Sequence, residues 1–190
     1  MSIFSDVSKY GFKRMILFPV TGEVRRLEEL IKEGDLDDIK KFASRIPPKH
    51  LVSMMMSQGY TPLIIAVDSR RRDIVNYFLD LGADVNQYCK NETALHRAIF
   101  RNDKGIIHDL IERGANMEAK ISRSGITPCI YSIIRGQAKV LDLLLEMGAI
   151  LDYKINSKVV NDELKRSESG ISKVHFKHER WRRVRKLLKF

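Results

Sequence analysis

Cysteine is scarce in this chain: Cys89 and Cys129 are the only two among 190 residues. They lie far apart in the sequence, with no CxxC pair and no neighbouring pair of histidines. This spacing fits neither a disulfide framework nor a zinc site. We therefore expect both thiols to be free and reduced.

Long apolar runs are also missing. The longest are MILFPV from Met15 and LIIAV from Leu63, far below the roughly 18 residues that a membrane-spanning helix needs. The first ten residues mix Ser5, Asp6 and Lys9 and do not have the pattern of a secretory signal. We expect an intracellular, cytoplasmic protein without a transmembrane segment. A nuclear location stays open, as does a host cell if the source is a virus or a bacterium.

Catalytic and cofactor motifs are absent. The chain contains no nucleotide-binding glycine motif, HExxH, GxSxG or paired cysteine ligand set. His175 and His178 are one helical turn apart, but no third ligand lies nearby, so we favour surface histidines over a metal site. No carboxylate pair has a spacing that favours acid/base work. We expect no catalytic residues, no cofactor and no metal, which leaves recognition of another molecule.

Basic residues outnumber acidic ones, and their distribution is uneven. The chain has 34 Lys and Arg against 24 Asp and Glu, a formal net charge of +10. Eight of these bases and one acid fall in residues 171–190, so this segment carries +7 of the total. The preceding part of the chain, 1–170, is only weakly basic.

A unit of roughly 33 residues repeats along the middle of the chain. A threonine opens each unit, at Thr61, Thr93 and Thr127, and a glycine closes it, at Gly82, Gly114 and Gly148. The interval from each threonine to its glycine is the same in all three units. Only the connectors vary in length, so the bodies are predicted to be stacked copies of one motif.

The pattern of each body predicts two short antiparallel helices. Threonine suits the N-cap, Pro62 and Pro128 suit the first helical position, and the glycines suit the left-handed end of the second helix. Small residues in the first helices, at Ala66, Ala98 and Ser132, are expected to let neighbouring helices approach closely. The apolar stripes of the second helices are Ile74, Val75, Phe78 and Leu79; Ile106, Ile107, Leu110 and Ile111; and Val140, Leu141, Leu144 and Leu145.

These units, with their GYTPL, NETAL and GITPC starts, resemble the ankyrin repeat, whose first helix opens with T-P-L-H-x-A. The resemblance covers Gln58 to about Asp152. It implies an all-α ankyrin-repeat solenoid of stacked helix-turn-helix units with degenerate terminal capping repeats. The signature histidine, which in the family hydrogen-bonds between neighbouring repeats, is present only as His96, so more apolar contact between repeats is expected here.

The flanking segments are interpreted as degenerate repeats. Residues 22–57 contain apolar stripes on either side of Gly34 and are predicted to form an N-terminal capping repeat. Residues 58–152 form the three regular repeats, and residues 153–190 a degenerate C-terminal repeat that ends in a basic amphipathic helix. Residues 1–21 are an N-terminal extension. Terminal repeats must offer solvent a polar outer face.

The resemblance also implies where a partner binds. In ankyrin arrays, partners dock on the exposed side of the first helices and on the connector tips. The matching first-helix residues are Ile65, Asp68, Arg97, Phe100, Arg101, Tyr131, Ile134 and Arg135, and the matching tip residues are Tyr88, Lys90 and Arg123. Phe100, Tyr131 and Ile134 are large apolar residues where packing is not expected to demand them, which favours an interface centre.

The C-terminal segment allows two interpretations. Its apolar stripe is Trp181, Val184, Leu187 and Leu188, and its basic face is Arg182, Arg183, Arg185, Lys186 and Lys189. A cap helix with a charged outer face is the favoured interpretation. The alternatives are contact with an anionic membrane surface or an acidic protein, a nuclear localisation signal, or binding to nucleic acid phosphates. Nucleic acid is the least favoured of these, because no groove-reading module accompanies the basic residues.

Two functional hypotheses follow. The first is a non-catalytic protein-interaction module, an adaptor or an inhibitor, that presents a rigid surface to another protein; a host-directed viral or bacterial protein is one form of it. The second is a tether to an anionic membrane surface or nucleic acid through the basic C-terminal helix. The sequence does not identify the partner.

Overall fold

The computed structural model of the chain describes residues 22–121 and 125–151. The elements within these residues are α1 (Gly22–Glu33), α2 (Leu36–Ala43), α3 (Pro48–Ser53), the 3-10 helix η2 (Ser57–Gly59), α4 (Pro62–Asp68), α5 (Arg72–Asp80), α6 (Ala94–Arg101), α7 (Lys104–Glu112), α8 (Pro128–Ile134) and α9 (Ala138–Glu146). Their one β-bridge joins Cys89 to Glu92. The predicted N-terminal extension and basic C-terminal helix lie outside the described residues.

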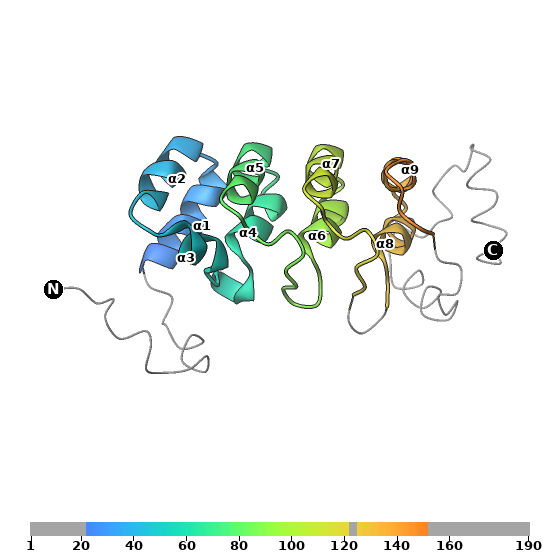
Figure 1. The fold of residues 1–190 in the computed structure, drawn as a ribbon, viewed down its shortest axis with the longest axis horizontal. Coiled ribbons are helices and arrows are strands. Elements are labelled where there is room, and N and C mark those ends of the chain that lie inside the picture. The colour runs from blue at the N-terminus through green and yellow to red at the C-terminus, as the bar shows by residue number, and fades with distance from the viewer. Residues whose placement is uncertain (1–21, 122–124, 152–190) are drawn as a thin grey trace.

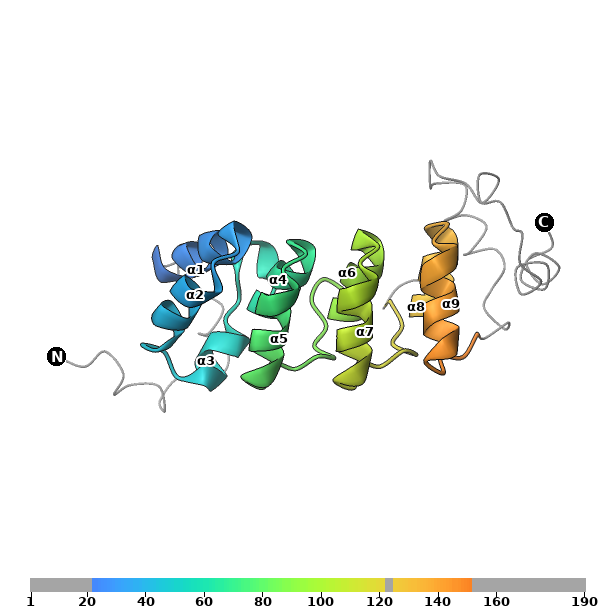
Figure 2. The ribbon, with the colours of Figure 1, turned by 90° about the horizontal axis from the view of Figure 1, so that it is seen from above.

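The helices form hairpins that stand side by side in a row (Figure 1). The pairs α1/α2, α4/α5, α6/α7 and α8/α9 follow one another along the long axis, and the view in Figure 2 shows α5, α7 and α9 aligned in one layer. The first helices contact each other in order: α1 packs on α4, α4 on α6, and α6 on α8. This arrangement confirms the predicted all-α solenoid of stacked helix-turn-helix units.

The predicted helix starts are confirmed. Thr61, Thr93 and Thr127 occupy the N-cap positions of α4, α6 and α8, with Pro62 and Pro128 in the first turn. The Thr61 hydroxyl accepts the Ile64 backbone N–H at 3.4 Å, which satisfies one of the unpaired donors of the first turn. All three threonines are buried.

Each second helix ends as predicted, at a glycine with positive φ. The values are 86° for Gly82, 84° for Gly114 and 96° for Gly148. In the three regular repeats, a residue with positive φ also follows the first helix: Arg70 (57°), Asn102 (56°) and Gly136 (66°). The sequence analysis missed this turn between the two helices. A left-handed arginine, which costs about 1–2 kcal/mol, carries no sequence signal for it, although Gly136 does.

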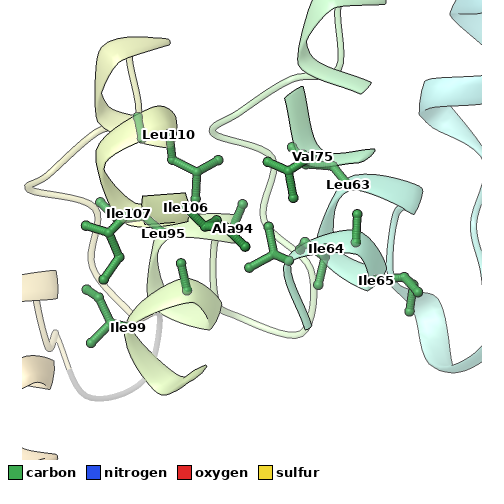
Figure 3. Packing of buried hydrophobic residues seen from close by; sticks show 14 of the residues in the cluster. Leu63, Ile64, Ile65, Val75, Ala94, Leu95, Ile99, Ile106, Ile107 and Leu110 are labelled. Carbon is green, nitrogen blue, oxygen red and sulfur yellow. The ribbon is translucent and has the colours of Figure 1, made fainter. Parts of the chain in front are cut away.

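Small residues are buried at matching positions of the first helices, as predicted. Ala66, Ala98 and Ser132 are each fully buried. The Ser132 hydroxyl, which would otherwise be an unsatisfied polar group, donates to the Cys129 carbonyl at 2.7 Å. Figure 3 shows apolar side chains of two successive repeats, such as Val75 and Ile106, in the space between them. One core therefore runs through the whole row of hairpins.

The second-helix stripes are mostly confirmed, with two corrections. Leu144 is fully buried, whereas Leu145 and its counterpart Ile111 are only partly buried against the core. All four assigned positions are buried in α5, but only three are buried in α7 and in α9. The fully buried face therefore centres on Val140, Leu141 and Leu144.

Ion pairs join the second helices of successive repeats. Arg72 of α5 donates from Nε and Nη2 to the Asp109 carboxylate of α7, at 2.6 and 2.7 Å. Asn76 donates to the same carboxylate at 2.9 Å. The hydrogen bond from Arg72 is the largest influence that holds the pKa of Asp109 below its usual value. This layer of the array is thus fixed by polar contacts as well as by apolar packing.

The N-terminal hairpin has the predicted stripe, with Leu27, Ile31 and Ile39 fully buried. It is joined to the next repeat by Arg71, whose Nη2 donates to the carbonyls of Lys32 and Glu33 at the end of α1. A cation at this end of a helix is favourable because the last carbonyls have no partner in the helix. Helix α3 was not predicted, although Pro48 at its start is a recognisable signal.

His96 is fully buried between the second and third regular repeats. Its Nδ1 accepts the Thr93 backbone N–H at 3.4 Å and lies 2.9 Å from the Thr93 hydroxyl oxygen. Burial lowers the pKa of His96 to about 4, and the Ile126 backbone, in the next connector, acts in the opposite direction. Nε2, however, has no hydrogen-bond partner among the described residues.

A pair of adjacent leucines tests the phase of α9. Leu144→Ala should lower the free energy of unfolding by roughly 2–5 kcal/mol, because it empties a fully buried position. Leu145→Ala should cost clearly less, since Leu145 is only partly buried. Urea denaturation of both variants measures the difference. If Leu145→Ala lost as much stability as Leu144→Ala, or more, the assignment of Leu144 rather than Leu145 to the fully buried face would be contradicted.

Acidification should destabilise the array through His96. Its pKa is lower in the folded chain, so between pH 6.5 and about 4 the unfolded chain binds a proton that the folded chain does not. For each pH unit over which only the unfolded chain binds this proton, the free energy of unfolding falls by about 1.36 kcal/mol. Between pH 6.5 and pH 5, His96 should therefore lower the free energy of unfolding by about 2 kcal/mol. His96→Gln should remove this part of the pH dependence, measured by urea denaturation, whereas the exposed control His108→Gln should keep it. An unchanged pH dependence in His96→Gln would contradict the assignment.

Candidate partner-binding face

The predicted first-helix residues lie at matching positions of α4, α6 and α8. We define the first-helix face by those that remain at least partly accessible: Asp68, Arg97, Phe100, Arg101, Tyr131 and Arg135. Contacts between successive repeats, described below, hold most of these side chains in place. The face is therefore a pre-ordered surface rather than a set of independent side chains.

Two predicted members are not accessible. Ile65 is 6% exposed and Ile134 is 5% exposed, and both belong to the continuous apolar core. The expectation that Ile134 stands where packing does not demand it is wrong. Helix α8 is short, and six of its seven residues are buried, so the spacing of its residues in the sequence does not predict which side chain stays accessible.

One ion pair crosses the face from α4 to α6. Arg101 donates from Nε and Nη2 to the two carboxylate oxygens of Asp68, at 2.8 and 2.6 Å. This paired geometry matches the planar fork of a guanidinium group to a carboxylate. The hydrogen bond that Arg101 donates to Asp68 is the largest influence that raises the pKa of Arg101. The opposite charges of these two predicted residues therefore neutralise each other.

Arg97 lies at the centre of a second polar network. Its Nη2 donates to the Tyr60 hydroxyl at 2.5 Å and pairs with Glu92, and its Nη1 lies 3.5 Å from Asp68. Tyr60 and Glu92 each directly precede the N-cap threonine of their own repeat, so Arg97 bridges the same position in two repeats. Burial raises the pKa of Glu92, and Arg97 opposes that rise. The sequence analysis missed Tyr60 and Glu92.

Phe100 is the aromatic centre of the face. The guanidinium carbon of Arg135 lies 4.5 Å from the ring centre, and those of Arg97 and Arg101 lie 5.6 and 5.7 Å from it. Such arrangements are favourable because the ring face is electron-rich. Tyr131, the second predicted aromatic, packs edge-on against His96 at 6.0 Å between ring centres.

The connectors are hydrogen-bonded to one another. The Tyr88 hydroxyl donates to the Lys120 carbonyl and accepts the Lys120 N–H, both at 3.2 Å, while half of the Tyr88 surface stays exposed. Lys90 lies over the Tyr60 ring, with Nζ 4.8 Å from its centre. Two predicted tip residues thus sit on an ordered part of the array. The third, Arg123, lies outside the described residues.

A repeated hydrogen bond joins the bases of the connectors. The Asn86 side chain accepts the Asn116 N–H at 2.7 Å, and the Glu118 side chain accepts the Ile150 N–H at 2.7 Å. Asn86 and Glu118 each lie four residues after the glycine that ends the second helix. The sequence analysis missed this bond, although the shared offset of two polar residues was a usable signal.

Within residues 22–121 and 125–151, no cluster of three His, Cys, Asp or Glu residues could hold a metal ion. In the same ranges, no helix combines the length and apolar character needed to cross a membrane. Burial raises the pKa of Cys129 to about 12, which makes it a poor nucleophile. The basic C-terminal residues Arg182, Arg183, Arg185, Lys186 and Lys189 lie outside the described residues.

Stacked helical hairpins with an ordered face on their first helices define a class of repeat protein that binds other proteins. Comparison with known families then identifies the repeat. Residues 58–91 match the ankyrin repeat, and residues 95–145 match a family of ankyrin repeats in many copies. The chain is an ankyrin-repeat protein, and its repeats form a protein–protein interaction module. The family is generally non-catalytic.

Known relatives support this assignment. The chain is 34% identical to protein lin-12 of Caenorhabditis elegans over 54% of its own length and 8% of the relative. It is 26% identical to diacylglycerol kinase iota of Mus musculus, over 84% of this chain and 14% of the relative. It is 26% identical to ankyrin repeat and SAM domain-containing protein 6 of Rattus norvegicus, over 64% of this chain and 14% of the relative. The chain thus spans a small part of each, and the similarity does not extend to their other activities.

The coupling between Arg101 and Asp68 can be measured directly. In a double-mutant cycle of Arg101→Gln and Asp68→Asn, we expect a coupling energy of about 0.5–1 kcal/mol, since the pair is joined at two atoms and only partly exposed. The control cycle, Arg25→Gln with Glu29→Gln on the surface of α1, should give less. Chemical denaturation measures both. A coupling for Arg101 and Asp68 below about 0.2 kcal/mol, the lower end for exposed ion pairs, would contradict a fixed pair.

Proposed function

We propose that this chain is an adaptor or inhibitor that holds a partner protein against its first-helix face. The observation that carries the proposal is the ordering of Phe100 and its surrounding arginines by contacts between repeats. Arg135 of the next repeat stacks on the Phe100 ring, and Asp68 of the preceding repeat pairs with Arg97 and Arg101. Side chains that are already fixed lose little conformational freedom on binding, so more of the contact energy is available for affinity. Aromatic and arginine residues are also those that most often dominate interface energies.

The proposed site combines the accessible face with the ordered connector residues. Phe100, Tyr131 and Arg135 form its centre, and Tyr88 and Lys90 extend it on the connector side. Asp68, Arg97 and Arg101 support the site by holding one another, because their charges are mutually satisfied. In this proposal the repeats at residues 58–152 supply the binding surface, and residues 22–57 and 153–190 are capping repeats.

A second candidate, a tether through the basic C-terminal segment, is favoured by charge alone. Residues 171–190 contain eight Lys and Arg and one Glu. Such a segment would bind an anionic surface with an affinity that falls as salt rises. The interaction-module proposal takes precedence because it accounts for both the repeats and the ordered face.

The proposal predicts loss of a specific partner from a variant of the face. Phe100→Ala combined with Tyr131→Ala should remove at least one protein that wild type captures from cell lysate by cross-linking, because the variant removes both aromatic contacts. The matched control is Tyr77→Ala, which removes a half-buried aromatic residue from α5 in the second-helix layer. Circular dichroism must first show that all three proteins are folded.

The two outcomes separate the candidates. Loss of a captured protein from the double variant, but not from Tyr77→Ala, supports the face and supplies the partner. If both variants capture the same proteins as wild type, the face is not the site. A salt-sensitive capture that disappears only when the basic residues of 182–189 are neutralised would favour the tether.

A further inference from the structure

Arg101 and Arg135 occupy the same position in successive repeats. Each lies eight residues after the N-cap threonine of its repeat, Thr93 and Thr127. The residue that each one contacts is also equivalent, since Asp68 and Phe100 both lie seven residues after their own threonine. The contacts of the two arginines can therefore be compared at equivalent positions of the repeat.

The comparison shows that Arg135 lacks the acceptor that Arg101 has. Nε of Arg101 donates to an oxygen of Asp68 at 2.8 Å. Nε of Arg135 is buried and has no hydrogen-bond acceptor among the described residues, because the equivalent position holds the ring of Phe100. No ion pair joins Arg135 to an acidic residue of 22–121 or 125–151. The ring contributes attraction to a cation but no oxygen that could accept a hydrogen bond.

The stack on Phe100 also fixes the guanidinium group. At 4.5 Å from the ring centre, the cation is held by packing rather than by a counter-charge. Because Nε is covered, the terminal Nη nitrogens are the donors left for an incoming group. A guanidinium that is already oriented matches a planar carboxylate with little further loss of freedom.

The charge around Arg135 favours an acidic partner. The acids of the first-helix face and its border, Asp68 and Glu92, are both paired with arginines of α6. Lys90 and Arg135, by contrast, stack on aromatic rings. The face therefore presents positive charge beside aromatic surface, which is complementary to acidic residues next to apolar ones.

We propose that Arg135 binds, through its Nη nitrogens, a carboxylate of an acidic segment in the partner protein, which supplies the counter-charge that Asp68 supplies to Arg101 within the array. This inference rests on the proposed function and adds the chemistry of the partner to it. Arg135 thereby selects a glutamate or aspartate of the partner. Phe100 and Tyr131 contact the apolar residues next to that acidic residue. The binding requires no covalent step and no metal.

Selection from a random dodecapeptide display library against the full chain tests the proposal. We expect the selected peptides to be enriched in Asp and Glu. Binding of one such peptide, measured by fluorescence polarisation, should weaken about tenfold in Arg135→Gln, the factor that corresponds to about 1.4 kcal/mol. Replacing the acidic residue of the peptide by its amide should have a similar effect.

Two further variants sharpen the test. Arg113→Gln also removes one positive charge, but from the end of α7, where Arg113 pairs with Asp80 at 2.7 Å, and it should leave binding unchanged. Phe100→Asp introduces a carboxylate at the position equivalent to Asp68. The new carboxylate should pair with Arg135 within the array. Binding of the acidic peptide should therefore weaken at least as much as it does in Arg135→Gln.

The outcomes distinguish this inference from the proposed function. Peptides that lose binding in the Phe100→Ala and Tyr131→Ala variant, yet are not acidic or are indifferent to Arg135→Gln, would overturn the inference and keep the function. Peptides indifferent to every variant of the face would overturn both. Acidic peptides that respond only to neutralisation of Arg182, Arg183, Arg185, Lys186 and Lys189 would assign the acid binding to the C-terminal segment and also overturn the inference.

Discussion

Close approach of the first helices is the constraint on which the rest of the structure depends. Ala66, Ala98 and Ser132 are fully buried at matching positions, and helices with side chains this small can pack with little separation. The stacking brings each first-helix residue within reach of its counterpart one repeat away. Both of the arginine contacts compared above, the pairing of Arg101 with Asp68 and the stack of Arg135 on Phe100, span that distance.

The same stacking divides the polar residues between stability and recognition. Where two repeats offer opposite charges, as at Asp68 and Arg101, the charges satisfy each other and order the surface. Where the next repeat offers a ring instead, as at Phe100 and Arg135, the cation is positioned but has no described counter-charge. A repeat architecture can thus vary one residue of a contact and convert a structural pair into a place for an external ligand.

Much of the array was predictable, but much less of the face. The threonine starts, the glycine ends and the small buried residues follow from period and local propensity, and all are confirmed. Accessibility was misjudged at Ile65 and Ile134, which are core residues. Tyr60 and Glu92 were missed because their partner, Arg97, belongs to the body of a repeat whereas they belong to connectors. The roles of the remaining face residues stay predictions.

The sequence by itself determined the repeating unit, because each helix start, stop and apolar stripe is a local property of about 33 residues that recurs three times. It also determined the all-α class and the uneven distribution of charge. Only the tertiary structure decided which side chains remain accessible and which charges are satisfied. The reason is physical: burial and ion pairing depend on residues one repeat away, whose side-chain directions are set by the stacking of the helices and not by their own local sequence.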